Sequence, residues 1–266
     1  MKIEGTAILV TGANRGIGRA LVEEALSRGV KRVYAATRQS MAHPDRRVTS
    51  LTMDVTNVAQ IREAVEKIDA LDILINNAGV SPFDDLSDRR VLEQQLAVNL
   101  FGSYDVTQAL LPLLARSRGA IVNILSLASI AALPFSPAYS ISKAASFSLS
   151  QSLRTLLAGR GVSVHRVLPG PVDTDMTRGL DIAKASPESV AWAILDGVEN
   201  GEEEIFPDPM SESVAEGWRS SAVKALERQF AAYAEASPAS EASPSGSGHE
   251  GKSETITREA HPCCSA

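Results

Sequence analysis

A tyrosine and a lysine, Tyr139 and Lys143, stand four residues apart near the start of a stretch with a helical pattern. This spacing places the phenol and the ammonium on one face of a helix. A free tyrosine has a pKa of about 10, and a nearby cation typically lowers the pKa of an acid by roughly 1 to 3 units. The pair therefore predicts a tyrosine that exchanges protons near neutral pH, with Lys143 as the group that activates it.

Two more polar residues precede this pair. Ser126 follows an apolar run that predicts a strand, where its hydroxyl could bond a substrate oxygen, and Asn99 lies in a long predicted helix, where it could relay protons to Lys143. Each of the four residues could also have a purely structural role. Tyr139 could be a half-buried core aromatic and Lys143 a solvated surface charge, while Ser126 and Asn99 could be hydrogen-bonding groups at a strand end and in a helix. Their combination favours a catalytic group.

A glycine-rich segment, residues 11–18, follows the first predicted strand and leads directly into a helical pattern. Its glycines permit a tight turn and a close approach of the backbone to a pyrophosphate, which the helix N-terminus attracts. The alternative is an ordinary glycine-rich turn. Two further strand ends favour a dinucleotide, because Asp54 could accept a hydrogen bond from an adenine and residues 76–79 could line the cleft. The cofactor contacts expected here are Gly12, Asn14, Arg15, Gly16, Ile17, Gly18, Asp54, Val55, Asn77, Ala78 and Gly79.

The elements that position these residues alternate along the chain. Apolar runs predict strands at residues 7–10, 32–36, 48–53, 73–75, 120–125, 162–168 and 204–206. Amphipathic stretches predict helices at residues 16–28, 58–68, 89–116, 138–159 and 187–199, with a further helical segment over 211–236. This alternation is typical of an α/β fold: a single Rossmann-type domain with a doubly wound parallel sheet of about seven strands flanked by helices.

The chain resembles the short-chain dehydrogenase/reductase family over residues 6–206. Residues 11–18 match its T-G-x-x-x-G-x-G motif, residues 76–79 its N-N-A-G motif, and residues 139–143 its Y-x-x-x-K motif. The resemblance identifies Asn99, Ser126, Tyr139 and Lys143 as the catalytic tetrad, with Tyr139 and Lys143 also touching the cofactor. It places the segment with Pro169, Gly170, Val172 and Thr174 against the nicotinamide. Leu125 and Ser129 stand where the family often has serine and glycine, which leaves the substrate open.

The family implies hydride transfer between a nicotinamide and the carbonyl or alcohol carbon of a small organic substrate. Tyr139 would move the proton and Ser126 would hold the oxygen, so no metal is expected. Two alternatives remain: a regulatory protein that binds NADP(H) without turnover, and an NAD-dependent alcohol dehydrogenase. A homodimer or homotetramer is the expectation from relatives.

The choice of cofactor depends on the end of the second predicted strand. It ends in Thr37 and Arg38, where NAD-preferring relatives carry an acidic residue, and Arg15 adds a second cation inside the glycine loop. Two guanidinium groups converging on a 2′-phosphate would favour NADP(H), with NAD(H) as a possible second cofactor. The alternative is that both arginines are solvated surface charges.

Composition limits the class of protein and the partners that it can bind. The 266 residues are 44% hydrophobic and carry a formal net charge of −6, which disfavours nucleic acid and anionic membranes as partners. Residues 1–5 lead into a strand pattern without a signal peptide, and a cytoplasmic protein is expected. We expect one domain over residues 1–236 and a disordered, Ser- and Pro-rich tail over 237–266, which holds both cysteines, Cys263 and Cys264.

Overall fold

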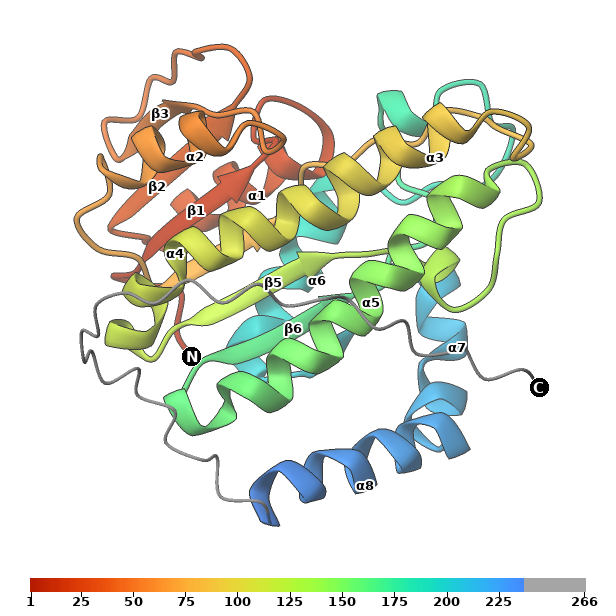
Figure 1. The fold of residues 1–266 in the computed structure, drawn as a ribbon. Coiled ribbons are helices and arrows are strands. Elements are labelled where there is room, and N and C mark those ends of the chain that lie inside the picture. The colour runs from red at the N-terminus through yellow and green to blue at the C-terminus, as the bar shows by residue number, and fades with distance from the viewer. Residues whose placement is uncertain (237–266) are drawn as a thin grey trace, which may run out of the picture.

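A seven-stranded parallel sheet forms the centre of the chain in the computed structural model, which describes residues 1–236 (Figure 1). The predicted tail over 237–266 lies outside the described residues. The strands are β1 (Ala7–Thr11), β2 (Arg32–Thr37), β3 (Val48–Thr52), β4 (Ile73–Asn76), β5 (Ala120–Ile124), β6 (Ser163–Val167) and β7 (Glu204–Ile205). Their spatial order, β3-β2-β1-β4-β5-β6-β7, confirms the predicted doubly wound fold. The order reverses between β1 and β4, where such sheets open a crevice at the carboxyl ends of the strands.

Helices cover both faces of this sheet. They are α1 (Gly16–Ser27), α2 (Val58–Val65), α3 (Arg89–Leu96), α4 (Ser103–Ser117), α5 (Pro137–Leu157), α6 (Pro187–Asn200), α7 (Pro209–Arg219) and α8 (Ala222–Ala236). Side chains alternate along each strand, so Ile8 and Val10 pack with α1 and α6, whereas Leu9 packs with α2, α4 and α5. The central strands β1, β4 and β5 are therefore buried along their whole length, which is why they are mostly apolar, whereas the edge strand β3 is largely half-buried.

The helix predicted over residues 89–116 is not continuous. A wide π-helical segment, Ala97–Gly102, separates α3 from α4. Gly102 packs against the strand-end loop so closely that an added Cβ would lie 2.7 Å from the Cγ2 of Val55. The buried Asn99 lies inside this segment and turns its amide toward a neighbouring loop. Tertiary contacts thus outweigh the regular helical pattern of the sequence here.

The helical segment predicted over 211–236 is two helices, because the chain breaks at Ser220 and Ser221. The first of them begins earlier than predicted, at Pro209. Asp208 caps it, with its Oδ1 accepting hydrogen bonds from the backbone N–H groups of Met210 and Ser211. An Asp-Pro pair of this kind is a typical helix start, and it was the signal in the sequence for this boundary.

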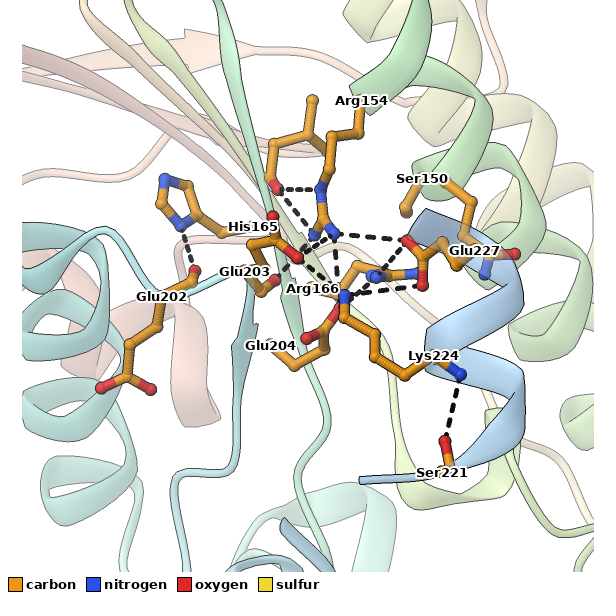
Figure 2. A network of polar contacts seen from close by, with 12 residues as sticks. Ser150, Arg154, His165, Arg166, Glu202, Glu203, Glu204, Ser221, Lys224 and Glu227 are labelled. Carbon is orange, nitrogen blue, oxygen red and sulfur yellow. Dashed lines mark hydrogen bonds and ion pairs between the residues drawn. The ribbon is translucent and has the colours of Figure 1, made fainter. Parts of the chain in front are cut away.

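A buried cluster of charges attaches α8 to the sheet (Figure 2). Three cations meet three carboxylates in it: Arg154, Arg166 and Lys224 pair with Glu203, Glu204 and Glu227. The Arg166 side chain is fully buried, and its guanidinium carbon lies 4.5 Å from the centre of the Phe147 ring. The charges balance within the cluster, which is the condition for burying them without a large electrostatic penalty.

Candidate active site

Tyr139 and Ser126 meet at the carboxyl edge of the sheet. Ser126 lies two residues after the end of β5, and its Oγ accepts a hydrogen bond of 3.1 Å from the backbone N–H of Ala128. Tyr139 is in the first turn of α5 with its side chain buried, and it lies close enough to Ser126 for the serine side chain to lower the pKa of the phenol. The structure therefore brings together two hydroxyl groups that the sequence predicted as partners on a substrate oxygen.

Lys143 lies one turn further along α5, with its side chain buried. Its Nζ donates a hydrogen bond of 2.8 Å to the backbone oxygen of Ile124 and lies 5.7 Å from the centre of the Tyr139 ring. Burial lowers the pKa of Lys143 to about 8, because the charged form loses its hydration. The pair thus shares a helical face as predicted.

The pKa of Tyr139 differs from the sequence prediction. Burial raises it to about 12, and the hydrogen bond from Ser126 offsets only part of that rise. Desolvation is the largest cause, because burial disfavours the charged phenolate, and Lys143 is directed to the backbone oxygen of Ile124. The direction of the pKa shift is therefore opposite to the one predicted from the nearby cation.

Asn99 reaches the same edge of the sheet from the π-helical segment. Its amide forms two hydrogen bonds with the backbone of Val80, of 2.9 and 3.0 Å, and a third of 2.8 Å to the Oγ of Ser142. Gly79 lies between Asn99 and Lys143, since an added Cβ there would be 3.3 Å from Asn99 Oδ1 and 3.7 Å from Lys143 Nζ. The four predicted catalytic residues are therefore gathered in one place, and the Asn99 side chain fixes the Val80 loop.

The glycine loop joins β1 to α1 and is shaped by close backbone contacts. Gly12 and Gly16 have positive φ angles of 66° and 51°. A Cβ on Gly18 would lie 2.2 Å from the backbone oxygen of Gly12, so only glycine fits. Asn77 secures the loop, because its Nδ2 donates to the backbone oxygens of Thr11 and Gly12 at 2.8 and 3.2 Å. Ala78 lies directly against Gly12.

The remaining residues of the loop divide into exposed and packed ones. Asn14 and Arg15 are exposed, whereas Ile17 packs against the core between α1 and the sheet. No side chain of the described residues caps the start of α1, whose first N–H groups lie beside the glycines. A phosphate would suit this helix end, because it offers N–H donors and a positive dipole end.

The residues after β2 and β3 form the part of the cofactor site where the adenine end is expected. Asp54 Oδ1 accepts hydrogen bonds of 2.9 and 2.7 Å from the backbone N–H and the hydroxyl of Thr56. These bonds, the backbone one first, hold the pKa of Asp54 below its ordinary value, and the charge of Arg38 adds to the effect. Val55 is buried. At the end of β2, Thr37 is buried and Arg38 is exposed.

The segment after β6 closes the site on the other side. The Pro169 oxygen accepts a hydrogen bond of 3.0 Å from the N–H of Leu127, and the Gly170 N–H donates to Asp208 Oδ2 at 2.8 Å. Val172 pairs with Ala185 in an isolated bridge. Thr174 touches the glycine loop, because a Cβ on Gly16 would lie 3.0 Å from its Cγ2. The expected nicotinamide segment and the expected phosphate loop are thus in contact.

Three acidic residues shape this site and were missed as site residues from the sequence. Asp208 fastens Gly170, and Asp84 caps the helix that carries Tyr139. Asp175 forms an ion pair with Arg15, with Oδ2 3.0 Å from Nη1. The predicted convergence of Arg15 with Arg38 is therefore not the arrangement of the structure, because the Arg15 side chain is directed to Asp175. Short-range sequence patterns carry no sign of partners 160 residues apart.

The arrangement fits a dinucleotide. The glycine cradle, the start of α1 and the exposed Arg38 suit phosphates, and the buried Tyr139 and Lys143 suit an uncharged, stacked ring nearby. Among residues 1–236 no group of His, Cys, Asp and Glu side chains is placed to hold a metal ion. Nor is any helix in that range long and apolar enough to cross a membrane.

Comparisons with known proteins agree with this geometry. Residues 6–185 match the sequence profile of the short chain dehydrogenases. The chain is 35% identical over 193 residues to the 3-oxoacyl-(acyl-carrier-protein) reductase FabG of Escherichia coli, which covers 68% of this chain and 79% of that protein. It is 30% identical over 237 residues to the ketoacyl reductase HetN of Nostoc, covering 80% of this chain and 82% of HetN.

Solved structures of short chain dehydrogenases are also similar to this chain. A short chain dehydrogenase from Burkholderia cenocepacia, determined in complex with NADP, superimposes with a TM-score of 0.79 at 34% identity, covering 86% of this chain and 99% of the other. A second one, from Burkholderia phymatum in complex with NAD, has a TM-score of 0.72 at 21% identity, covering 86% and 96%. The second likeness concerns the fold alone.

Proposed function

Because the chain belongs to the short-chain dehydrogenase/reductase family, we propose that it is an NADP(H)-dependent oxidoreductase of the carbonyl reductase or alcohol dehydrogenase type, acting on a small organic substrate. The observation that carries the proposal is the placement of the buried Tyr139 beside the buried Lys143 on one face of α5, near Ser126 at the end of β5. A protein that only binds a dinucleotide does not need two hydroxyl groups close together beside a buried lysine.

In the reductive direction the residues divide the work as follows. A bound reduced nicotinamide would supply the hydride that the carbonyl carbon receives. Tyr139 donates its phenolic proton to the carbonyl oxygen, and Ser126 stabilises that oxygen by a hydrogen bond. Lys143 holds positive charge beside the phenol, which favours the phenolate left after proton transfer. Asn99 keeps the Val80 loop against this group and so maintains the shape of the site.

The raised pKa of Tyr139 agrees with this assignment. A phenol with a pKa of about 12 is fully protonated at neutral pH and is ready to act as an acid in the reductive direction. The reverse reaction needs the phenolate, and the protein's own groups do not favour that form. Tyr139 is therefore in the protonation state that carbonyl reduction requires, while the ratio of reduced to oxidised cofactor sets the net direction of the reaction.

The preference for NADP(H) depends on Arg38. It follows β2 directly, is exposed, and stands where an acidic residue would contact the ribose of NAD. The NADP complex of the Burkholderia cenocepacia relative, at 34% identity, supports the same choice. Arg15 joins this site only if it leaves Asp175.

The substrate side of the site carries exposed aromatic rings. Phe83 and Phe135, on the loops after β4 and β5, have ring centres 6.0 Å apart and lie largely in solvent. Met176 is exposed on the segment after β6. We infer a substrate whose carbonyl carries an apolar body, because burying these side chains would contribute to its binding.

The central experiment is a panel of aldehydes, ketones and secondary alcohols of increasing apolar size, followed by NADPH absorbance. We expect turnover in at least one carbonyl class and a loss of two or more orders of magnitude in Tyr139→Phe, with cofactor binding kept. Tyr34→Phe is the matched control, since this buried tyrosine belongs to the core under α2 and α4. Near-normal turnover in Tyr139→Phe would exclude the mechanism.

The cofactor preference has its own test. We expect Arg38→Asp to weaken NADPH binding by roughly tenfold or more and to leave NADH binding unchanged, because a charged hydrogen bond is worth about 1.5 to 3 kcal/mol. Arg32→Asp, at the other end of the same strand, is the control. Tighter binding of NADH than of NADPH by the unaltered protein would overturn the preference.

Self-association is part of the proposal. Phe101 and Tyr104, around the start of α4, and Ile141 of α5 are large, exposed apolar side chains. The helices α4 and α5 form the layer in front of the sheet in Figure 1. A second copy would bury these side chains. Sedimentation analysis should find a dimer or tetramer, and Phe101→Glu should shift it toward the monomer.

A further inference from the structure

The side chain of Arg15 is held away from the end of β2 by an ion pair. Its Nη1 lies 3.0 Å from Asp175 Oδ2, and both side chains are substantially exposed, at 61% and 42%. An exposed pair of this kind contributes little to stability, since water screens it and two long side chains must be ordered. Arg15 can therefore exchange this partner for a stronger one at small cost.

Asp175 does not depend on Arg15 for charge compensation. Its other oxygen, Oδ1, pairs with Arg178 three residues along the chain. If Arg15 leaves, the carboxylate remains beside a cation. The exchange is thus easier than the breaking of an isolated pair, because no charge is left alone.

The ion pair spans two segments of the expected cofactor site. Arg15 is the residue before α1, inside the glycine loop, and Asp175 follows Thr174, which contacts Gly16. A cleft of about 470 Å³ lies between these segments, and its rim also carries the cations Arg19 and Lys184. A phosphate carries about two negative charges at neutral pH, compared with one for a carboxylate, and so competes well for the guanidinium of Arg15.

We propose that Asp175 is a selectivity residue that competes with the 2′-phosphate of NADP(H) for Arg15. Contact between Arg15 and the 2′-phosphate then requires Arg15 to leave Asp175, which reduces the preference for NADP(H) below the value that Arg15 and Arg38 would give together. Cofactors without this phosphate leave the pair in place. The inference rests on the proposed NADP(H) preference and adds a residue that opposes it.

The test is a double-mutant cycle on dissociation constants, measured by fluorescence titration with NADPH and NADH and without any substrate. We expect Asp175→Asn to tighten NADPH binding about two- to fivefold and to leave NADH binding unchanged. The expected change in NADPH affinity corresponds to the loss of one exposed ion pair. In the Arg15→Gln background, Asp175→Asn should have no effect on either cofactor, since the competition is gone.

Asp173→Asn is the matched control. It removes the same charge from the same cleft two residues earlier, and Asp173 has no ion pair among the described residues. A gain shared by both cofactors, an equal gain in Asp173→Asn, or a gain that persists with Arg15→Gln would each overturn the proposal. The ratio of the NADPH and NADH dissociation constants of the unaltered protein separately tests the proposed function. A failure of the proposed NADP(H) preference can therefore be distinguished from a failure of the role proposed for Asp175.

Discussion

The carboxylate of Asp84 accepts a hydrogen bond from the backbone N–H of Ala138, 3.1 Å from its Oδ1, and so caps from outside the helix that carries Tyr139. Ser136, the local cap position, makes no such bond. Asp84 Oδ2 also accepts a weak bond from Gln95 of α3 at 3.4 Å. A carboxylate at this end of α5 is favoured by the helix dipole, and it ties the loop after β4 to the first turn of the helix.

We expect Asp84→Ala to lower kcat about tenfold, because the first turn of α5 and with it the Tyr139 hydroxyl would lose a fixed position relative to Ser126. Asp84→Asn keeps an acceptor and should recover most of this loss. Asp85→Ala, which alters the neighbouring exposed acid, is the control. If the Asn variant is as slow as the Ala variant while the Tm values agree, positioning by this hydrogen bond is the wrong explanation.

The pH profile of reduction should be set by Lys143. Its pKa of about 8 means that it is charged below that pH and neutral above it, whereas Tyr139 keeps its proton up to about pH 12. We expect kcat/KM for a carbonyl substrate to be level below pH 8 and to fall above it. Steady-state rates from pH 6 to 10 check this, and Lys143→Met should be slow and lack the fall near pH 8.

The same lysine has an effect on stability with a definite sign. Unfolding returns Lys143 to a pKa of 10.5, so the unfolded chain binds more protons than the native one between about pH 8 and 10.5. The contribution of Lys143 to the free energy of unfolding therefore increases with pH across that window. Urea unfolding should give a larger free energy of unfolding at pH 9.5 than at pH 7.5 for the unaltered protein. This increase should be smaller or absent in Lys143→Met.

Gly18→Ala should disturb the glycine loop. The new methyl group would lie 2.2 Å from the Gly12 oxygen, so the backbone has to move, at a cost of about 1–3 kcal/mol. Binding of both NADPH and NADH should weaken about tenfold or more. Gly217→Ala is the control, because a Cβ there meets nothing within 4 Å. Unchanged affinity in Gly18→Ala would show that the loop is not the phosphate site.

The sequence was sufficient for the doubly wound sheet, but not for the break in the helix at Ala97–Gly102 or for the acidic residues that contact the site. Strands buried on both faces are readable as apolar runs, and the spacing from Tyr139 to Lys143 places both on one helical face. Desolvation depends on packing, which is why the direction of the Tyr139 pKa could not be read from that spacing. The pairing of Arg15 with Asp175 likewise depends on how two distant loops meet.

The charge cluster around Arg166 should respond strongly to the loss of a single partner. Glu204→Ala leaves the fully buried guanidinium of Arg166 without one of its two carboxylates, and we expect a loss of about 3–5 kcal/mol in the free energy of unfolding. Adding Arg166→Met should recover most of it by restoring the charge balance. Glu63→Ala, in an exposed pair with Lys67, should cost about 0.5 kcal/mol or less. A double variant no better than Glu204→Ala would contradict this.

The polarity of α8 is reversed relative to an ordinary surface helix. Lys224 is the one buried side chain among residues 222–232 of this helix, whereas Val223 and Leu226 are exposed. Detachment of α8 from the sheet would therefore hydrate charges rather than apolar surface. Exposure of polar groups does not raise the heat capacity, and detachment of a single helix exposes a small area and so has a small denaturant m-value, in contrast to the unfolding of the sheet. The amide protons of α8 can then exchange with solvent through an opening whose free energy is almost independent of urea, while those of β1 and β4 exchange only with global unfolding.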